Sequence, residues 1–404
     1  MNLRLAALIV NFDSGSYALA LARAVRQQWL ELGAANADLE IVVVDNASNT
    51  DQGRELAALQ QFGARVVQSA QNLGYAAGMN LALAQTRGSD SDLVLVLNPD
   101  LALFPGALGR LLGTQRETPG AGAIGPRAFL EPTGTWRMPP NRLPTPEGEW
   151  LAARALREPE LARALSNTRT QHALREWTAI EPTEVEMLSG ACLLLSRRAI
   201  ASAGGLFDER YPLYFEDTDL CMRLSRAGLA LVFEPRAEIV HHWARSSGIE
   251  RGDSEPGRRR HLSRDAYFER WFGAEARGPL ALADALVGAS AVFPPGEFRE
   301  LGECHTAPSF EFSGSGTRLL EIAMVPSFPL AAGALVGGAS WRMDERAFEW
   351  FYRGRYFARA LDSIDPSGPV HRADRGPWSF LKPSPARVQP LSPLELERGV
   401  ISKR

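Results

Sequence analysis

Three acidic residues at the start of a helical pattern are the densest candidate for chemistry in this chain. Glu216, Asp217 and Asp219 follow Tyr214 and Phe215 and lead an apolar repeat of helical spacing. Part of the explanation is local, because acids in a first helical turn complement its free N–H groups. The chemical alternative is general base catalysis, in which a positioned carboxylate takes the proton of a hydroxyl as that hydroxyl attacks. The aromatic neighbours then offer stacking surface for a ligand ring.

Carboxylate and amide side chains also follow two apolar runs. Asp45 and Asn46 come at the end of one run, where a carboxylate can accept hydrogen bonds from a ribose hydroxyl or a base N–H. Capping of the next helix explains Asp45 equally well. Asn98 and Asp100 flank Pro99 after a second run, where a divalent cation between two phosphates would lie. The alternative there is an Asn-Pro-Asp turn.

A segment with two glycines lies between these runs. Gly74 and Gly78 allow a helix start to approach a ligand closely, and free N–H groups at such a start suit a pyrophosphate. A tight turn with a close helix–sheet contact is the alternative. Asn72 and Asn80 favour the binding role, because a buried amide without partners is costly.

A histidine pair and a basic run complete the set of candidates. His241 and His242 end a strand-like run, and a neutral imidazole there can complete the coordination of a metal. A structural role for the pair carries equal weight. The run Arg258–Arg260 is expected on a solvated loop, with a phosphate or membrane-surface contact as the alternative.

The elements that must position these residues alternate between strand and helix signals. Continuous apolar runs separated by helical patterns are what a parallel sheet covered on both faces requires. They predict a doubly wound α/β domain with a mostly parallel sheet, whose ligands gather at the carboxyl ends of the strands. The expected strands are 5–10, 40–45, 65–68 and 93–97, and the expected helices are 16–32, 51–62 and 75–86.

The α/β pattern gives domain boundaries. We expect the α/β domain to span residues 1–275 and to contain a loop and one or two exposed helices as an insertion at 131–184. Residues 276–404 are expected to form a small β-rich domain with a proline-rich tail. Its strand-like runs are 310–312, 319–324 and 348–352.

Taken in order, the candidate segments resemble the family 2 glycosyltransferases, and most closely their rhamnosyltransferase-like branch. The resemblance covers about residues 3 to 250. The segments that carry it are V-N-F, V-V-V-D-N-A-S, N-L-G-Y-A-A-G-M-N, L-N-P-D, L-S-G-A-C-L-L-L-S-R-R-A-I, G-G-L-F-D-E-R-Y-P-L-Y-F-E-D-T-D-L-C-M-R and I-V-H-H-W. It implies a sheet of the nucleotide-diphospho-sugar transferase type and an inverting, single-displacement mechanism.

Roles for individual residues follow from the same resemblance. Asp217 would be the catalytic base, supported by Glu216, while Tyr214 and Asp219 would contact the acceptor. The donor would be bound by Asn11, Asp45, Asn46, Asn72, Gly74, Gly78, Asn98 and Asp100.

The resemblance also implies a divalent metal, Mg²⁺ or Mn²⁺. Asp100 and His241 would hold it, with Asn98–Asp100 as this chain's form of the Asp-x-Asp motif. Asn98 stands where the strict motif has its first Asp, so one direct carboxylate ligand is expected. Leu206 and Pro212 also depart from the usual run before the acidic residues.

We therefore expect a glycosyltransferase that moves a sugar, first of all rhamnose from dTDP-rhamnose ahead of UDP sugars, to a glycan or lipid-linked acceptor in cell-surface polysaccharide synthesis. The net charge of −3 gives no sign of a nucleic-acid partner. Three well-separated cysteines and no apolar run of bilayer length favour a cytoplasmic protein, with a peripheral contact at the inner membrane face. The C-terminal region could support an oligomer.

Two other functions compete with this expectation. One is a catalytically inactive protein that binds a nucleotide sugar or glycan. The other is a sugar-nucleotide pyrophosphorylase, whose phosphate loop the segment Ser313–Arg318 resembles, although a hairpin turn is the simpler explanation. A dinucleotide-dependent dehydrogenase is disfavoured because Asn11–Ser16 contains no G-x-G-x-x-G.

Overall fold

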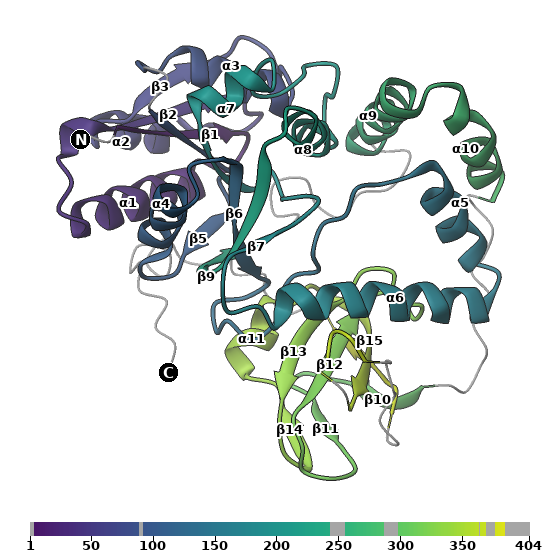
Figure 1. Ribbon diagram of the computed structural model, residues 1–404. Coiled ribbons are helices and arrows are strands. Elements are labelled where there is room, and N and C mark those ends of the chain that lie inside the picture. Colours follow the sequence, from purple (N-terminus) through teal and green to yellow (C-terminus); the bar gives the residue numbers. More distant parts are fainter. Residues whose placement is uncertain are drawn as a thin grey trace.

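The larger part of the chain is a mixed β-sheet with helices on both faces (Figure 1). The strand order is β3-β2-β1-β4-β8-β6-β9-β5, and β7 pairs with β9. The computed structural model describes residues 4–88, 92–242, 255–286, 298–362, 364–368 and 376–383. The strands are β1 (Leu5–Asn11), β2 (Leu39–Asp45), β3 (Arg65–Gln68), β4 (Leu93–Leu97), β5 (Leu101–Leu103), β6 (Ala121–Phe129), β7 (Thr183–Glu184), β8 (Cys192–Ser196) and β9 (Ala230–His241).

Strands β1 to β4 are parallel and form one half of the sheet, as the apolar runs predicted. In β1 the alternate residues Leu5 and Ile9 face one buried apolar layer, while Leu8 and Val10 face the other. A strand covered on both faces therefore has to be apolar throughout, which explains the continuous runs. The prediction of a helix-covered, mostly parallel α/β sheet is confirmed.

Two helical layers cover this sheet. Helices α1 (Gly15–Glu31), α2 (Gly53–Gln61) and α4 (Ala107–Glu117) supply the first apolar layer. Helices α3 (Tyr75–Ala84), α7 (Arg197–Ser202) and α8 (Glu216–Arg226) supply the second.

The second half of the sheet is mixed. Strand β8 is antiparallel to both β4 and β6, whereas β6 and β9 run parallel to each other. Strand β5 pairs antiparallel with the end of β9 and places Leu101 opposite His241. This pairing draws the residues after β4 toward the carboxyl end of β9.

A separate β-rich part lies below the larger sheet in Figure 1. Its main sheet has the order β10-β16-β15-β12-β13, and β11 pairs with β14. This confirms the β-rich C-terminal region. Its elements are β10 (Arg299–Glu303), β11 (Ser309–Glu311), β12 (Arg318–Ala323), β13 (Ala332–Val336), β14 (Ser340–Arg342), α11 (Glu345–Trp350), β15 (Gly354–Leu361) and β16 (Trp378–Lys382).

The prediction that residues 348–352 form a strand is wrong, because most of them belong to helix α11. Asp344 caps this helix by accepting hydrogen bonds from the N–H groups of Arg346 (2.8 Å) and Ala347 (3.3 Å). At the other end the ammonium of Lys382 donates to the carbonyl of Phe351 at 2.6 Å. Capping groups at both ends stabilise a short helix that its aromatic residues alone do not predict.

The insertion forms helices α5 (Pro146–Ala155) and α6 (Pro159–Trp177). The expectation that these helices are simply exposed is wrong for α6. Its last turns bury Ala173, Leu174 and Trp177, and these residues pack with Leu319 and Leu361 of the C-terminal sheet.

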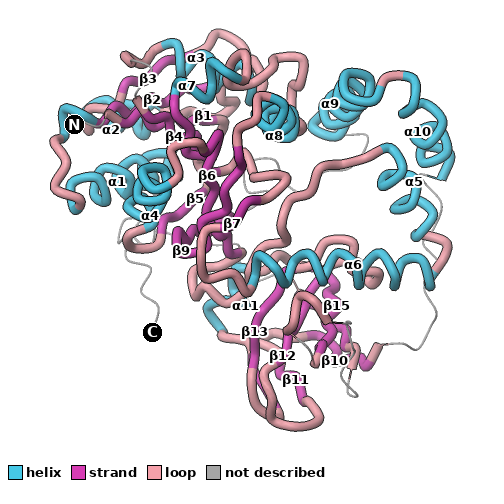
Figure 2. The backbone as a smooth tube through the Cα atoms, viewed as in Figure 1, coloured by secondary structure: helices cyan, strands magenta, loops and turns pink. Residues whose placement is uncertain are grey.

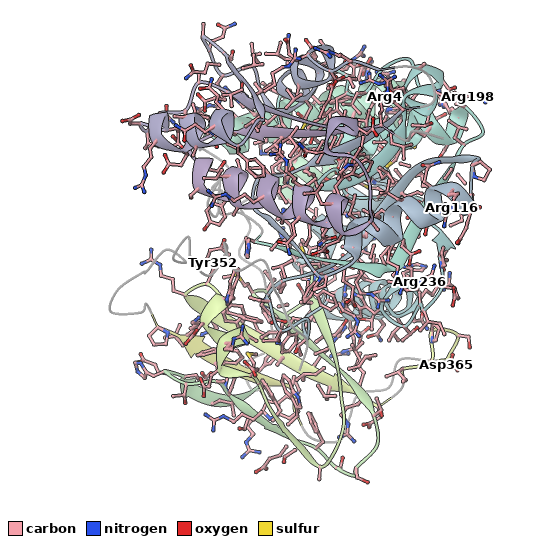
Figure 3. All side chains as sticks on the ribbon, turned by 90° about the vertical axis from the view of Figure 1, so that its left-hand side faces the viewer. Arg4, Arg116, Arg198, Arg236, Tyr352 and Asp365 are labelled. Carbon is pink, nitrogen blue, oxygen red and sulfur yellow. The ribbon has the colours of Figure 1, made fainter. Side chains whose placement is uncertain are left out.

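An ion-pair network joins α6 to the same sheet. The fully buried carboxylate of Glu321 pairs with Arg169 of α6 (2.5 Å) and with Arg359 of β15 (2.7 Å). Figure 3 draws the side chains of both parts, with Arg4 on the α/β part and Tyr352 on the C-terminal part. Where the domain boundary falls stays a prediction.

Two further helices, α9 (Glu255–Phe272) and α10 (Ala274–Leu286), follow the larger sheet in the sequence (Figure 2). The basic run Arg258–Arg260 therefore lies in a helix and not in the expected loop. Trp243 lies outside the described residues. Among the described helices, none combines the length and the apolar character that crossing a bilayer requires.

Candidate active site

Asn11 and Asp45 lie side by side at the carboxyl ends of β1 and β2. The register pairs them directly, and the amide of Asn11 donates to Oδ1 of Asp45 at 2.7 Å. The hydroxyl of Ser48 donates to the same oxygen at 2.6 Å. Asn11 is fully buried and Asp45 nearly so. The orientation of the Asp45 carboxylate is therefore fixed before any ligand binds.

Asn46 organises the segment that contains Asn72 and Gly74. Its Oδ1 accepts the N–H of Leu73 at 2.9 Å, and its Nδ2 donates to the carbonyl of Gly74 at 3.0 Å. Gly74 has a φ of +84°, and a Cβ there would lie 2.7 Å from the carbonyl oxygen of Pro212. Only glycine fits such a turn without strain.

Gly78 and Asn80 make packing contacts, and for Gly78 a close helix–sheet contact was the alternative considered from the sequence. A Cβ on Gly78 would lie 3.0 Å from Cγ2 of Val10, so α3 approaches β1 closely at this point. The amide of Asn80 donates to the carbonyl of Phe207 at 2.8 Å and accepts that residue's N–H at 3.2 Å.

Asp100 and His241 meet where β5 pairs with β9. Nε2 of His241 lies 3.6 Å from Oδ1 of Asp100, and the amide of Asn98 lies 3.5 Å from the same nitrogen. Oδ1 of Asp100 is buried and has no hydrogen-bond partner among the described residues. Burial lowers the pKa of His241, although the charge of Asp100 opposes the shift, so its imidazole is neutral at neutral pH.

This pair fits one side of a divalent metal site. A buried carboxylate oxygen without a partner and a neutral imidazole are both ligand atoms. Within the described residues, no three His, Cys, Asp or Glu side chains come together as a complete metal site. A bound ion would therefore take its other ligands from phosphate oxygens and water, as Mg²⁺ usually does.

The acidic residues begin helix α8 after two residues with left-handed backbone. Tyr214 and Phe215 have φ values of +63° and +67°. Such conformations cost about 1–3 kcal/mol each and are concentrated at functional sites. They turn the chain so that Oδ2 of Asp217 accepts the N–H of Gly190 at 2.8 Å.

Both Glu216 and Asp217 have raised pKa values. Burial raises the pKa of Glu216 well above its ordinary value, and the charge of Asp217 raises it further. Burial also raises the pKa of Asp217, although hydrogen bonds from Gly190 and Thr218 oppose the shift. Both carboxyls therefore hold their protons to higher pH than an exposed carboxyl does.

Asp219 does not face a space in which an acceptor could bind, and the acceptor-binding role expected for it is corrected. Its side chain is fully buried. Oδ1 accepts hydrogen bonds from Tyr211 (3.1 Å) and Trp271 (3.0 Å), and Oδ2 pairs with Arg223 at 2.7 Å. Arg270 lies 3.3 Å from Oδ1. These partners make Asp219 a link between α8 and α9.

Tyr75 is a site residue that the sequence analysis did not assign. Its hydroxyl donates to the carbonyl of Gly190 at 3.2 Å. Its pKa is raised well above the ordinary value, first by burial and then by the charges of Glu216, Asp217 and Asp100. Tyr75 and Asp217 therefore both bond to Gly190, although these residues come from distant parts of the chain. The only sequence signal for Tyr75 is its position in the segment with Gly74.

Arg259 is a second such residue. Its guanidinium donates to Oδ1 of Asn72 at 3.4 Å, so α9 reaches the segment that Asn46 holds. The basic run was visible in the sequence, but its contact with a segment so far away was not.

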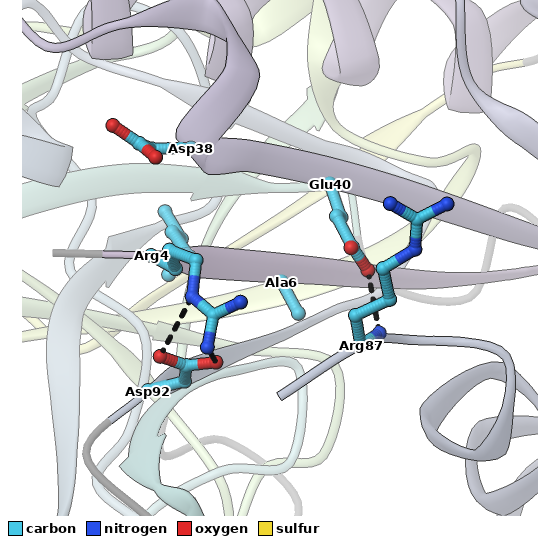
Figure 4. A pocket seen from close by; sticks show the side chains of 7 residues that line it. Arg4, Ala6, Asp38, Glu40, Arg87 and Asp92 are labelled. Atoms are coloured by element: carbon cyan, nitrogen blue, oxygen red, sulfur yellow. Dashed lines mark hydrogen bonds and ion pairs between the residues drawn. The ribbon is translucent and has the colours of Figure 1, made fainter. Parts of the chain in front are cut away.

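A small hollow elsewhere carries none of the predicted site residues. It lies at the amino ends of β1, β2 and β4, where Arg4 pairs with Asp92 and Glu40 accepts the N–H of Arg87 (Figure 4). The candidate site lies at the opposite, carboxyl ends of the same strands. The segment Ser313–Arg318 is not a phosphate loop, since Arg318 is buried and donates to the carbonyls of Ser313 and Gly338.

Comparison with known proteins finds one matching family model and several similar proteins. The family model described as Glycosyl transferase family 2 matches residues 7–195. The N-acetylglucosaminyl-diphospho-decaprenol L-rhamnosyltransferase of Mycobacterium tuberculosis is 37% identical over 221 residues, which are 52% of this chain and 68% of that protein. The O-antigen biosynthesis protein RfbC of Myxococcus xanthus is 28% identical over 258 residues, which are 58% of this chain and 17% of that protein.

Two solved structures are also similar. The mannosyltransferase PcManGT from Pyrobaculum calidifontis, in complex with GDP-Man and Mn²⁺, is 17% identical with a TM-score of 0.39, over 73% of this chain and 77% of that chain. GalNAc-T7 with UDP, GalNAc and Mn²⁺ is 13% identical with a TM-score of 0.46. That match covers 68% of this chain and half (50%) of the other.

Proposed function

This chain belongs to the family 2 glycosyltransferases, and we propose that it transfers a sugar from a nucleotide diphosphate donor to an acceptor hydroxyl with inversion at the anomeric carbon. The observation that carries the proposal is that residues 190–191 join the two acidic segments. The N–H of Gly190 donates to Asp217 at 2.8 Å, and the carbonyl of Ala191 accepts the N–H of Asn98 at 2.8 Å, two residues before Asp100. Asp100 would bind the metal and Asp217 would accept the proton. Transfer of a sugar from a diphosphate oxygen to a hydroxyl oxygen needs both functions close to the reacting atoms.

The donor is proposed to bind along the carboxyl ends of β1, β2 and β4. Asp45, already oriented by Asn11, would accept hydrogen bonds from the ribose or the base. The turn at Gly74 would face the diphosphate, and Arg259 beside Asn72 would add positive charge there. The rhamnosyltransferase among the relatives supports dTDP-rhamnose as the first donor to test, ahead of UDP sugars.

Asp100 and His241 would hold the Mg²⁺ or Mn²⁺ ion. When bound, such an ion offsets negative charge that develops on the departing nucleotide diphosphate. The imidazole of His241 and the buried Oδ1 of Asp100, which has no hydrogen-bond partner among the described residues, both offer ligand atoms to such an ion.

Asp217 is proposed to be the base. The acceptor oxygen attacks the anomeric carbon, the bond from that carbon to the diphosphate oxygen breaks, and the electron pair leaves with the diphosphate. The proton of the attacking hydroxyl passes to Asp217, whose Oδ2 is held by the N–H of Gly190. Glu216 is proposed to support Asp217 from the preceding position of the same helical turn. Tyr214 is proposed to contact the acceptor.

The acceptor is proposed to be a glycan, and in particular a saccharide linked to a lipid. The relative from Mycobacterium tuberculosis carries a lipid-linked acceptor in its name, N-acetylglucosaminyl-diphospho-decaprenol. An enzyme that uses such an acceptor would work from the cytoplasm against the membrane surface, in cell-surface polysaccharide synthesis.

Calorimetry with dTDP-, UDP- and GDP-linked sugars tests the proposal, with Mn²⁺ and with a chelator. We expect one donor to bind only with the metal, and Asp100→Asn to weaken that binding by about tenfold or more. Asp265→Asn, at an exposed carboxylate of α9, is the matched control and should bind as the wild type does. If no donor binds under either condition, the proposed function is wrong and an inactive binding protein takes its place.

A further inference from the structure

A cavity of about 200 Å³ opens beside His241, on the side of the sheet that faces the C-terminal part. Its walls are mostly apolar. The catalytic sheet contributes Arg127, Phe233 and His241, and the insertion contributes Met138 and Glu176. Leu330 is the contribution of the C-terminal part, from the connection between β12 and β13.

The three parts of the wall are held together by backbone and side-chain contacts. Arg137 and Gly333 exchange two backbone hydrogen bonds, at 2.8 and 3.0 Å. The ring of Trp177 packs against Gly333 so closely that a Cβ there would lie 2.4 Å from it. The indole N–H of Trp177 donates to the carbonyl of Met138 at 2.8 Å. The cavity is therefore a defined feature of the seam between the two sheets.

Two charged side chains interrupt the apolar walls. Arg127 donates to the carbonyls of Glu176 and Ala179, but its Nε is buried without a hydrogen-bond partner among the described residues. Burial raises the pKa of Glu176 to about 7, so its carboxyl can donate as well as accept near neutral pH. Buried polar groups of this kind gain most from a ligand that brings hydroxyl groups.

The cavity adjoins the base through a single short segment. Ser189 and Ala191 line the cavity, and Gly190 between them donates its N–H to Asp217 at 2.8 Å. A ligand in the cavity therefore lies next to the residue proposed to take the acceptor's proton. His241 marks the side on which the donor phosphates are proposed to bind.

We propose that this cavity binds the saccharide unit of the acceptor and that the C-terminal part helps to select it through Leu330. A pyranose ring has apolar C–H faces and an edge of hydroxyl groups, which matches apolar walls interrupted by Glu176 and Arg127. The inference rests on the proposed transferase function and adds to it the place of the acceptor. It also gives the C-terminal sheet a role in substrate binding.

The test uses two cavity variants and one control in the full-length chain. Glu176→Gln keeps the shape of the side chain and removes its ionisation, while Leu330→Asp changes the exposed wall without touching the sheet core. Leu282→Asp, at a similarly exposed leucine of α10, is the control. Saturation-transfer NMR measures binding of methyl N-acetylglucosaminide, and calorimetry measures the donor on the same proteins.

We expect Leu330→Asp to weaken saccharide binding about tenfold and Glu176→Gln to weaken it about fivefold, the scale of one or two hydrogen bonds or apolar contacts. Donor affinity should stay at the wild-type value, and the control should match the wild type in both measurements. Saccharide binding that is absent in the wild type, or equal in all four proteins, overturns the inference.

Failure of the proposed function gives a different pattern. If the saccharide binds in the cavity but no nucleotide sugar binds to any of the four proteins, the cavity assignment stands and the transferase proposal fails. If the cavity variants lose donor binding together with saccharide binding, the cavity belongs to the donor site and the inference is overturned.

Discussion

Nε2 of His241 lies 3.6 Å from Oδ1 of Asp100, and the pairing of β5 with β9 is what brings these distant residues together. The carboxylate oxygen is buried and has no hydrogen-bond partner among the described residues. Such an atom is costly unless something binds it. The arrangement therefore favours a cation between the two side chains, as the proposed function requires.

Replacing His241 tests whether this residue is the second ligand of the proposed metal site. We expect His241→Asn to weaken Mn²⁺-dependent donor binding by about tenfold, because loss of one ligand lowers metal affinity while the amide preserves polarity. Calorimetry with and without metal measures the effect. His305→Asn, at a histidine whose side chain is 74% exposed, serves as the control. Unchanged metal dependence in His241→Asn would remove this residue from the site.

The base assignment predicts both a loss of activity and a pH profile. Asp217→Asn should abolish transfer while donor affinity stays unchanged, because the amide cannot take a proton. Burial raises the pKa of Asp217 above its ordinary value of 3.8, so the acid limb of the wild-type kcat/KM profile should lie above that pH. Steady-state rates across pH measure the profile. An Asn variant with wild-type turnover would show that another group takes the proton.

Replacing Glu216 by Gln is expected to change the free energy of unfolding by an amount that grows with pH. Its pKa in the folded protein is raised well above 4.5, the ordinary value that the unfolded chain keeps. As pH rises above 4.5 the unfolded state ionises first, so the wild type loses stability until the pH passes the folded pKa. Glu216→Gln cannot ionise and should therefore be more stable than the wild type at pH 7 to 8, and equal near pH 4.

Denaturant unfolding at several pH values measures this difference. Glu303→Gln replaces an exposed glutamate of the C-terminal part and should show no comparable trend. A Glu216→Gln variant that is less stable than the wild type at pH 8 would mean that the ionised carboxylate is stabilised in the fold.

The contact between α6 and the C-terminal sheet can be tested at one glycine. Gly333→Ala places a Cβ 2.4 Å from the ring of Trp177, so the helix and the strand must separate. Overpacking of this kind costs about 1–3 kcal/mol, which denaturant unfolding would register. Gly337→Ala is the matched control, since a Cβ there meets no atom within 4 Å. Equal stability of the two variants would show that α6 and the strand move apart at little cost in free energy.

Much of the catalytic sheet could be predicted from the sequence alone. The limits expected for β3 and β4 agree with the structure, and those for β1 and β2 differ by one residue. A strand buried on both faces leaves a continuous apolar run, which is a local and unambiguous signal. Asp45 and Asp100 were placed by the same reasoning, because Asp45 ends one such strand and Asp100 follows shortly after another.

The local sequence pattern did not predict structure that depends on tertiary contacts. Residues 348–352 are rich in aromatic side chains, yet Asp344 and the distant Lys382 stabilise a helix there. Asp219 lies in an acidic cluster whose pattern predicts the start of a helix on the surface. It is buried because Trp271 and Arg270 of α9 lie over it.

The sequence by itself determined the α/β sheet, the family and the residues that begin or end its strands and helices. Those features depend on periodicity and on residue type at one place in the chain. Only the tertiary structure decided that Gly190 bonds to both Tyr75 and Asp217, that Asp100 lies beside His241, and that Leu330 of the C-terminal part lines a cavity there. Such contacts join residues far apart in the chain, and their free energy depends on partners that no local pattern specifies.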